Sequence, residues 1–221
     1  MLLERDIHIW SVDLTVDRQQ IEKFSQFLTN QERQRAAKFI NPTHGDNWIV
    51  ARGNLRQILS HYLNLAPAQI VFNYSLHGKP EIEDREIQFN LSHSHDRAVY
   101  AISRKYPVGI DLEYIHPLPA ADLVDRFFSP AEQAIFHRLP MAIQQAAFFH
   151  AWTQKEAYLK ACGTGLHTPL DKIEVSIDPR TPAEIISAPT EWMWQIHKLA
   201  ISPAYAGAIV IGGTDGEIKY L

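Results

Sequence analysis

The chain has 221 residues, 46% of them hydrophobic, and a formal net charge of −4 at pH 7. This composition can supply one large core or two small ones, and it argues against a protein that coats nucleic acid, which needs a basic excess. No stretch reaches the roughly 20 apolar residues of a spanning helix, and the N-terminus carries charges where a secretory signal has its apolar core. Cys162 is the single cysteine, so we expect neither a disulfide nor a thiolate metal site in a cytoplasmic protein.

The first half of the chain is predicted to combine helices with a small sheet. In chain order we expect a strand at 6–14, helices at 18–39 and 46–63, and a short strand at 70–74. A turn at 77–80, a loop at 90–94 and a buried strand at 98–103 follow. Pro67 ends the second helical region, because proline cannot continue a helix.

The second half repeats a similar order of elements. We expect a strand at 108–114, then helices at 120–128, 130–139 and 143–163, and finally strands at 173–177, 192–199 and 205–211. The sequence predicts an α+β fold whose two halves, 1–105 and 106–221, each carry an antiparallel-type sheet. The join at 104–107 is short, so we expect the halves to pack tightly with a site between them. No repeat is seen at the residue level.

Two carboxylates in the predicted strand at 108–114 share one face. Asp111 and Glu113 are two residues apart, so their side chains project to the same side, while Ile110 and Leu112 face the core. Paired carboxylates repel unless a cation joins them, and oxygen ligands without cysteine or histidine favour Mg²⁺. A solvent-facing polar strand end is the alternative, because such triplets are common by chance.

The predicted helix at 143–163 carries a second polar group. Trp152, Glu156 and Lys160 recur every four residues and therefore share one face, with Lys155 beside it. An ordinary exposed Glu–Lys pair is the alternative. The aromatic run at 148–152 and the glycines after the helix favour a largely buried helix whose charged side chains need partners.

Several motifs in this order resemble the 4'-phosphopantetheinyl transferases of the Sfp-like, surfactin-synthetase-activating branch. The matching segments are Gly-Lys-Pro at 78–80, Asn-Leu-Ser-His-Ser at 90–94 and Val-Gly-Ile-Asp-Leu-Glu at 108–113. They continue with Arg-Phe-Phe-Ser-Pro-Ala-Glu at 126–132, Trp-x-x-Lys-Glu-Ala-x-x-Lys at 152–160 and Gly-Thr-Gly-Leu at 163–166. The resemblance is clear over residues 25–170.

The resemblance implies a fold of two similar α+β halves related by a pseudo-twofold axis, with coenzyme A in the cleft between them. It also implies transfer of 4'-phosphopantetheine from coenzyme A to a serine of an apo acyl, peptidyl or aryl carrier protein, with release of adenosine 3',5'-bisphosphate. The implied cofactor is Mg²⁺, with Mn²⁺ as a substitute. A monomer is expected, since one chain supplies both halves of the cleft.

The resemblance assigns roles to individual residues. Asp111, Glu113 and Glu156 resemble the metal ligands, and Glu156 is also the expected base for the serine proton, directly or through a water. Lys160 resembles the pyrophosphate contact and, with Glu156, forms the expected catalytic pair. The expected coenzyme A contacts are the phosphate-binding and adenine-side residues Arg35, Lys79, Pro80, Ser92, His93 and Lys160.

Other positions keep two interpretations. Arg52 and Arg56 either orient their helix or border the phosphate pocket, and Phe127 or Phe128 either joins the core or contacts the carrier protein. Relatives carry arginines between the positions of Phe39 and Trp48, and His44 is a possible replacement for one of them.

Two other functions compete with the transferase. A noncatalytic coenzyme A or nucleotide-binding module of the same fold would keep Lys79 and His93 but tend to lose a carboxylate, and all three are present. A magnesium-dependent phosphohydrolase would act without a carrier protein.

Overall fold

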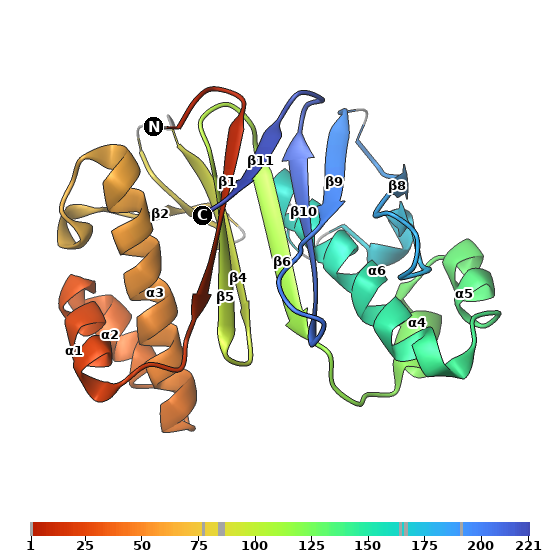
Figure 1. Ribbon diagram of the computed structural model, residues 1–221, viewed down its shortest axis with the longest axis horizontal. Coiled ribbons are helices and arrows are strands. Elements are labelled where there is room, and N and C mark those ends of the chain that lie inside the picture. The colour runs from red at the N-terminus through yellow and green to blue at the C-terminus, as the bar shows by residue number, and fades with distance from the viewer. Residues whose placement is uncertain (1, 77, 84–86, 164, 166–167, 191) are drawn as a thin grey trace.

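Two β-sheets lie face to face at the centre of the molecule, and helices cover the outer side of each (Figure 1). The computed structural model describes residues 2–76, 78–83, 87–163, 165, 168–190 and 192–221. His77, in the predicted turn, and Leu166, in the last motif, lie outside the described residues. The four layers confirm the predicted α+β arrangement of two halves.

In the part of the N-terminal half that the structure describes, there are three α-helices and five strands. They are β1 (Asp6–Asp13), α1 (Arg18–Phe27), α2 (Asn30–Ala36), α3 (Pro42–Leu63), β2 (Asn73–Tyr74), β3 (Pro80–Glu81), β4 (Gln88–Ser94) and β5 (Arg97–Ser103), with a 3₁₀ turn at Pro67–Gln69. Two predictions were wrong here. The helix expected at 18–39 is two helices, and the loop expected at 90–94 is strand β4, because its alternate polar side chains face protein rather than water.

The described residues of the C-terminal half form three α-helices and six strands. They are β6 (Val108–Tyr114), α4 (Ala120–Phe127), α5 (Pro130–Phe136), α6 (Met141–Cys162), β7 (Glu174–Val175), β8 (Ile185–Ser187), β9 (Trp194–Lys198), β10 (Tyr205–Gly212) and β11 (Glu217–Tyr220), with a 3₁₀ turn at Leu170–Lys172. The structure confirms the predicted bounds of β6, whereas β8 and β11 were not predicted. No helix in the described part of the chain combines the length and apolar character needed to cross a bilayer.

Strand order departs from the expected antiparallel pattern at one place. The first sheet runs β11-β1-β5-β4 and the second runs β6-β10-β9. All pairs in them are antiparallel except β1 with β11, which are parallel. The last strand therefore crosses back to the N-terminal sheet. The division at 105/106 falls in the short link between β5 and β6, and the organisation into two units stays a prediction.

Three apolar cores hold the layers together. Helix α3 packs on the N-terminal sheet, and α6 packs on β6 and β10. The third core lies between the sheets and joins Ile7, Ile9 and Val99 to Ile110 and other residues of β6 and β10. Because this core takes side chains from both halves, neither sheet could keep it buried alone.

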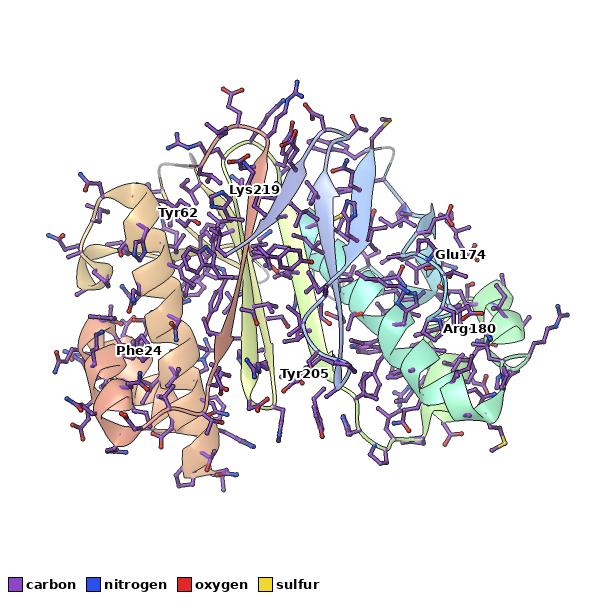
Figure 2. The ribbon with its side chains drawn as sticks, viewed as in Figure 1. Phe24, Tyr62, Glu174, Arg180, Tyr205 and Lys219 are labelled. Carbon is purple, nitrogen blue, oxygen red and sulfur yellow. The ribbon has the colours of Figure 1, made fainter. Side chains whose placement is uncertain are left out.

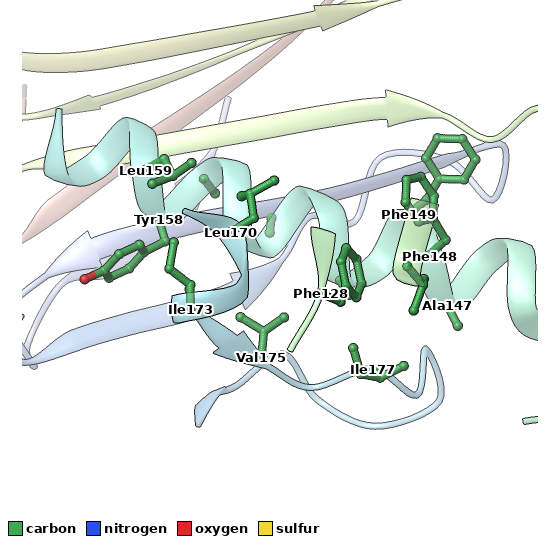
Figure 3. Packing of buried hydrophobic residues seen from close by; sticks show 14 of the residues in the cluster. Phe128, Ala147, Phe148, Phe149, Tyr158, Leu159, Leu170, Ile173, Val175 and Ile177 are labelled. Atoms are coloured by element: carbon green, nitrogen blue, oxygen red, sulfur yellow. The ribbon is translucent and has the colours of Figure 1, made fainter. Parts of the chain in front are cut away.

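The aromatic residues at the end of α4 divide between core and surface. Phe128 is 2% exposed and stacks on Phe148 at a centroid distance of 5.9 Å, within the cluster shown in Figure 3. Phe127 is half-buried and lies edge-on to Trp152. Phe128 is therefore a core residue, and of the two aromatics only Phe127 remains available to a partner.

A local repeat underlies the similarity of the two halves. Thr29 caps α2 and Ser129 caps α5, and in each case the glutamate three residues later bonds back to the backbone N–H of the cap. Each glutamate also pairs with the long helix of its half: Glu32 with Arg52 and Arg56, and Glu132 with Lys155. The two halves thus anchor their helices in the same way.

Candidate active site

The candidate site lies where β4 of the first sheet faces β6 of the second. Asn90 and Ser92 project from β4 toward β6, two residues apart and therefore on one face. The Asn90 Oδ1 accepts the Ile110 N–H at 2.9 Å, and the Ser92 hydroxyl donates to Asp111 Oδ1 at 2.9 Å. Side chains of one half thus set the position of the strand that carries the carboxylates.

Lys160 approaches the same point from α6. Its Nζ donates to Asp111 Oδ1 at 2.7 Å, to Ser92 Oγ at 3.1 Å and to the Ile110 carbonyl at 3.3 Å. Glu156, one helical turn earlier, lines the same groove of about 240 Å³ as Lys160. The structure therefore brings Asp111, Ser92 and Lys160 into contact, and Glu156 lines the groove beside Lys160.

The three carboxylates differ in burial, and Glu113 and Glu156 share an electrostatic effect. Asp111 is 3% exposed, and its Oδ2 is buried without a hydrogen-bond partner. Burial, and then the negative charge of Asp111, raises the pKa of Glu113 and of Glu156. A cation near these carboxylates would oppose both effects, because it attracts the ionised form of each group.

The donor set can be tested against a metal ion. Within the described ranges, no three acidic, histidine or cysteine side chains are spaced as a ready coordination sphere, and the Lys160 ammonium contacts one oxygen of Asp111. The buried, unpartnered Oδ2 and the hard oxygen chemistry of three neighbouring carboxylates nevertheless fit Mg²⁺. The chemistry of the residues present therefore suits the ion.

Gly109 sets the distance between β6 and α6. A Cβ at this position would lie 2.1 Å from the Ala157 carbonyl oxygen and 2.2 Å from the Ala161 N. Only glycine therefore allows β6 to approach α6 so closely. Sequence reasoning treated Gly109 only as part of a motif, although a glycine inside a strand is itself a signal of close backbone approach.

Lys79 bridges the two halves rather than pointing at open solvent. Its Nζ donates to the Lys160 carbonyl at 2.7 Å and to the Val108 carbonyl at 3.2 Å. Burial lowers the pKa of Lys79 to about 8. Pro80 and the Lys79 backbone line the same groove as Glu156, so this segment forms one wall of the site.

Arg35 and His93 meet in a smaller adjacent pocket. They line a cavity of about 150 Å³ together with Trp48 and Pro80, and the Arg35 guanidinium lies 5.6 Å from the centre of the Trp48 ring. Surrounding protein atoms desolvate the His93 imidazole, which lowers its pKa. The positive charge of Lys160 lowers this pKa further. Since Gly78, Pro80 and Leu91 line both this pocket and the groove, the two adjoin each other.

The two ambiguous arginines are primarily structural. Arg56 is 1% exposed and binds Glu32 and the Pro67 and Ile70 carbonyls, so it faces the interior. Arg52 also pairs with Glu32, although it reaches the wall of the Arg35 pocket. His44 lines a third cavity, of about 500 Å³, whose wall also includes His93.

Comparison with known proteins identifies the family. Two family models match, one described as the 4'-phosphopantetheinyl transferase superfamily over residues 107–210 and one as 4'-phosphopantetheinyl transferase, N-terminal, over residues 15–105. The 4'-phosphopantetheinyl transferase HetI of Nostoc sp. is 36% identical over 99% of this chain and 93% of its own length. The chain belongs to the 4'-phosphopantetheinyl transferase superfamily.

Two other members of the superfamily support the branch. The 4'-phosphopantetheinyl transferase psf-1 of Bacillus pumilus is 31% identical over 87% of this chain and 82% of its own. The 4'-phosphopantetheinyl transferase Sfp of Bacillus subtilis strain 168 is 26% identical over 92% and 91%. The predicted resemblance to Sfp-like transferases is confirmed.

Proposed function

We propose that this enzyme transfers 4'-phosphopantetheine from coenzyme A to a serine hydroxyl of an apo acyl, peptidyl or aryl carrier protein. The observation that carries the proposal is a groove lined by Glu156 and Lys160, whose ammonium binds Asp111, next to the pocket lined by Arg35 and His93. Such a site offers negative ligands for a cation beside positive groups for phosphates, which phosphoryl transfer requires.

Coenzyme A would lie along the groove with its nucleotide end in the N-terminal half. Arg35 and His93 are the proposed contacts of the 3'-phosphate, and Pro80 with the Lys79 backbone forms the wall beside the adenine. Lys160 would contact the pyrophosphate. To do so, its ammonium would leave Asp111 and bind a phosphate oxygen instead. Ser92, proposed from sequence as a coenzyme A contact, acts here by orienting Lys160 and Asp111.

The reaction forms one P–O bond and breaks another. The serine oxygen attacks the β-phosphorus, and the bond from this phosphorus to the oxygen bridging to the α-phosphate breaks, so adenosine 3',5'-bisphosphate leaves. The serine proton passes to Glu156, directly or through a water, because a positioned carboxylate can assist proton transfer. Lys160 offsets charge on the departing phosphate.

Mg²⁺ would be held by Asp111, Glu113 and Glu156. When bound, the ion supplies positive charge that stabilises the phosphoryl oxygens, and Mn²⁺ should replace it. We further propose a cytoplasmic, monomeric enzyme whose partners are carrier proteins and coenzyme A. One chain supplies both walls of the groove, which supports the monomer.

Intact-protein mass spectrometry tests the proposal directly. Apo carrier proteins of the acyl, peptidyl and aryl classes are incubated with the enzyme, coenzyme A and Mg²⁺, with a chelator control and with Asp111→Ala. We expect addition of one phosphopantetheine mass, lost with the chelator and strongly reduced in Asp111→Ala. Coenzyme A binding without any transfer to the three classes would instead identify a noncatalytic module, and release of adenosine 3',5'-bisphosphate without a carrier would identify a hydrolase.

A further inference from the structure

Ser94 holds a carboxylate of the site by a hydrogen bond whose direction is fixed. The Ser94 hydroxyl lies 2.8 Å from Glu113 Oε2, and its oxygen accepts the Tyr114 N–H at 3.0 Å. A serine hydroxyl has a single proton, and an amide N–H can only donate. The proton of Ser94 therefore points to Glu113, and the hydroxyl cannot turn away without leaving the amide unpaired.

The backbone that carries Ser94 is itself held firmly. Ser94 ends β4, and His95 after it has a φ of 55° in the left-handed region. The His95 ring stacks on Tyr114 at a centroid distance of 4.6 Å, and its carbonyl accepts the Asn47 Nδ2 at 3.1 Å. These contacts fix the turn from both halves, so Ser94 has little freedom to move away from β6.

The next residue of the turn is anchored as well. Asp96 accepts a hydrogen bond from the Tyr205 hydroxyl, and its carbonyl accepts the Leu14 N–H at 2.7 Å. Figure 2 labels Tyr205 at the end of the C-terminal sheet nearest the β4–β5 turn. Contacts from Leu14, which follows β1, and from α3, β6 and β10 therefore converge on the two residues that follow Ser94.

We infer that Ser94 is a positioning residue, which orients Glu113 of the opposite half to receive the divalent cation. The inference rests on the proposed function. Outer hydrogen bonds of this kind orient ligating carboxylates, and their loss typically weakens metal affinity by about ten- to a hundredfold. Ser94 performs no chemical step: it fixes one Glu113 oxygen and leaves the other free to face the ion.

Metal titration provides the test. The apparent Kd for Mn²⁺ is measured by electron paramagnetic resonance with saturating coenzyme A, using coenzyme A alone as the blank. Ser94→Ala and Ser94→Cys should raise this Kd at least about tenfold, whereas Ser94→Thr, which keeps a hydroxyl, should stay within about threefold of the wild type. The cysteine variant preserves side-chain size, so a folding defect caused by the loss of volume can be recognised.

Ser60→Ala is the matched control. Ser60 is also half-buried, and its hydroxyl makes one hydrogen bond, to the Gln57 carbonyl on α3, away from the groove. The inference would be overturned if the Kd of Ser94→Ala is unchanged, or if Ser94→Thr raises the Kd as much as Ser94→Ala does. Continued transfer by the wild type would show that the proposed function still holds in that case. Wild-type protein that transfers nothing would count against the proposed function instead, and wild-type protein that binds no Mn²⁺ would overturn the inference together with the metal site.

Discussion

At the scale of single residues, one buried lysine and two half-buried ones illustrate how differently one residue type can be used. Lys160 pairs with Asp111 and lines the groove. Lys155, from the same motif, is fully buried and binds Glu132 together with the Leu170 and Ile173 carbonyls. Lys79 binds two carbonyls and no carboxylate among the contacts described. The lysine without a carboxylate partner is the one whose charge costs most to bury.

This difference predicts a pH-dependent stability. The folded pKa of Lys79, about 8, lies below its ordinary value of 10.5, so between these values the unfolded chain keeps a proton that the folded protein has lost. Stability from this group therefore rises as pH increases from about 8 to about 10.5. Relative to Lys79→Met, the wild type should gain free energy of unfolding between pH 7.5 and pH 9.5.

Urea denaturation at several pH values measures this gain. Lys38→Met, which removes a lysine from the surface, controls for the loss of one positive charge. A difference between wild type and Lys79→Met that stays constant across the pH range would show that burial does not shift this lysine.

The placement of side chains was predictable where the sequence spacing determines a shared face. Helical periodicity placed Glu156 and Lys160 on one face of α6, and strand alternation placed Asp111 and Glu113 on one face of β6. The positions of Ser92 and Ser94 against those carboxylates depend on contacts between distant strands, for which a single sequence carries no direct signal. The alternation of Asn90, Ser92 and Ser94 was nevertheless visible as a strand-like pattern.

At the scale of elements, the packing of β6 on α6 determines the geometry of the site. Asp111 and Glu113 belong to the strand, and Glu156 and Lys160 belong to the helix. The two elements contact each other closely at Gly109, where the strand backbone lies against Ala157 and Ala161. Any change that separates the elements also separates the carboxylates from the lysine.

Gly109→Ala should therefore impair both stability and activity. Its Cβ would meet backbone atoms, which cannot move aside as a flexible side chain can, and overpacking of this kind costs about 1–3 kcal/mol or more. We expect a lower Tm by thermal denaturation and a large loss of kcat in the transfer assay. Gly216→Ala is the control, because its Cβ would approach neighbouring atoms no closer than 3.2 Å. Equal behaviour of the two variants would exclude a close-packing role for Gly109.

Element boundaries were predictable only where local signals are strong. The capping box of Thr29 and Glu32 separates α1 from α2, a signal present in the sequence but overridden by the continuous helical periodicity. Strand β11 has exposed residues at three of its four positions and a partner more than two hundred residues away, so neither pattern nor proximity indicated it. Long-range pairing of this kind is the part of the fold that the sequence does not reveal.

At the scale of the whole molecule, the two halves are joined by more than the short link at 104–107. Strand β11 pairs with β1, and Lys219 binds Asp6 at 2.6 Å where Figure 2 places it beside the first strand. The core between the sheets contains Ile7 and Ile9 from one half and Ile209 and Ile211 from the other, each 0% exposed. The active-site groove lies along this same junction, so its shape depends on both halves being folded.

We therefore predict that the halves unfold together. Separating them would expose the shared core, and at about 1.5–3 kcal/mol for each large apolar side chain the cost is on the order of 10 kcal/mol, comparable with the whole stability of a typical domain. Fluorine NMR of fluorotryptophan-labelled protein in urea can follow Trp10 and Trp48 in one half and Trp152 and Trp194 in the other. The four signals should share one midpoint, because neither half retains enough buried surface to remain folded once the other has opened. Midpoints that separate by half would show instead that the sheets are stable on their own and that the groove can open without global unfolding.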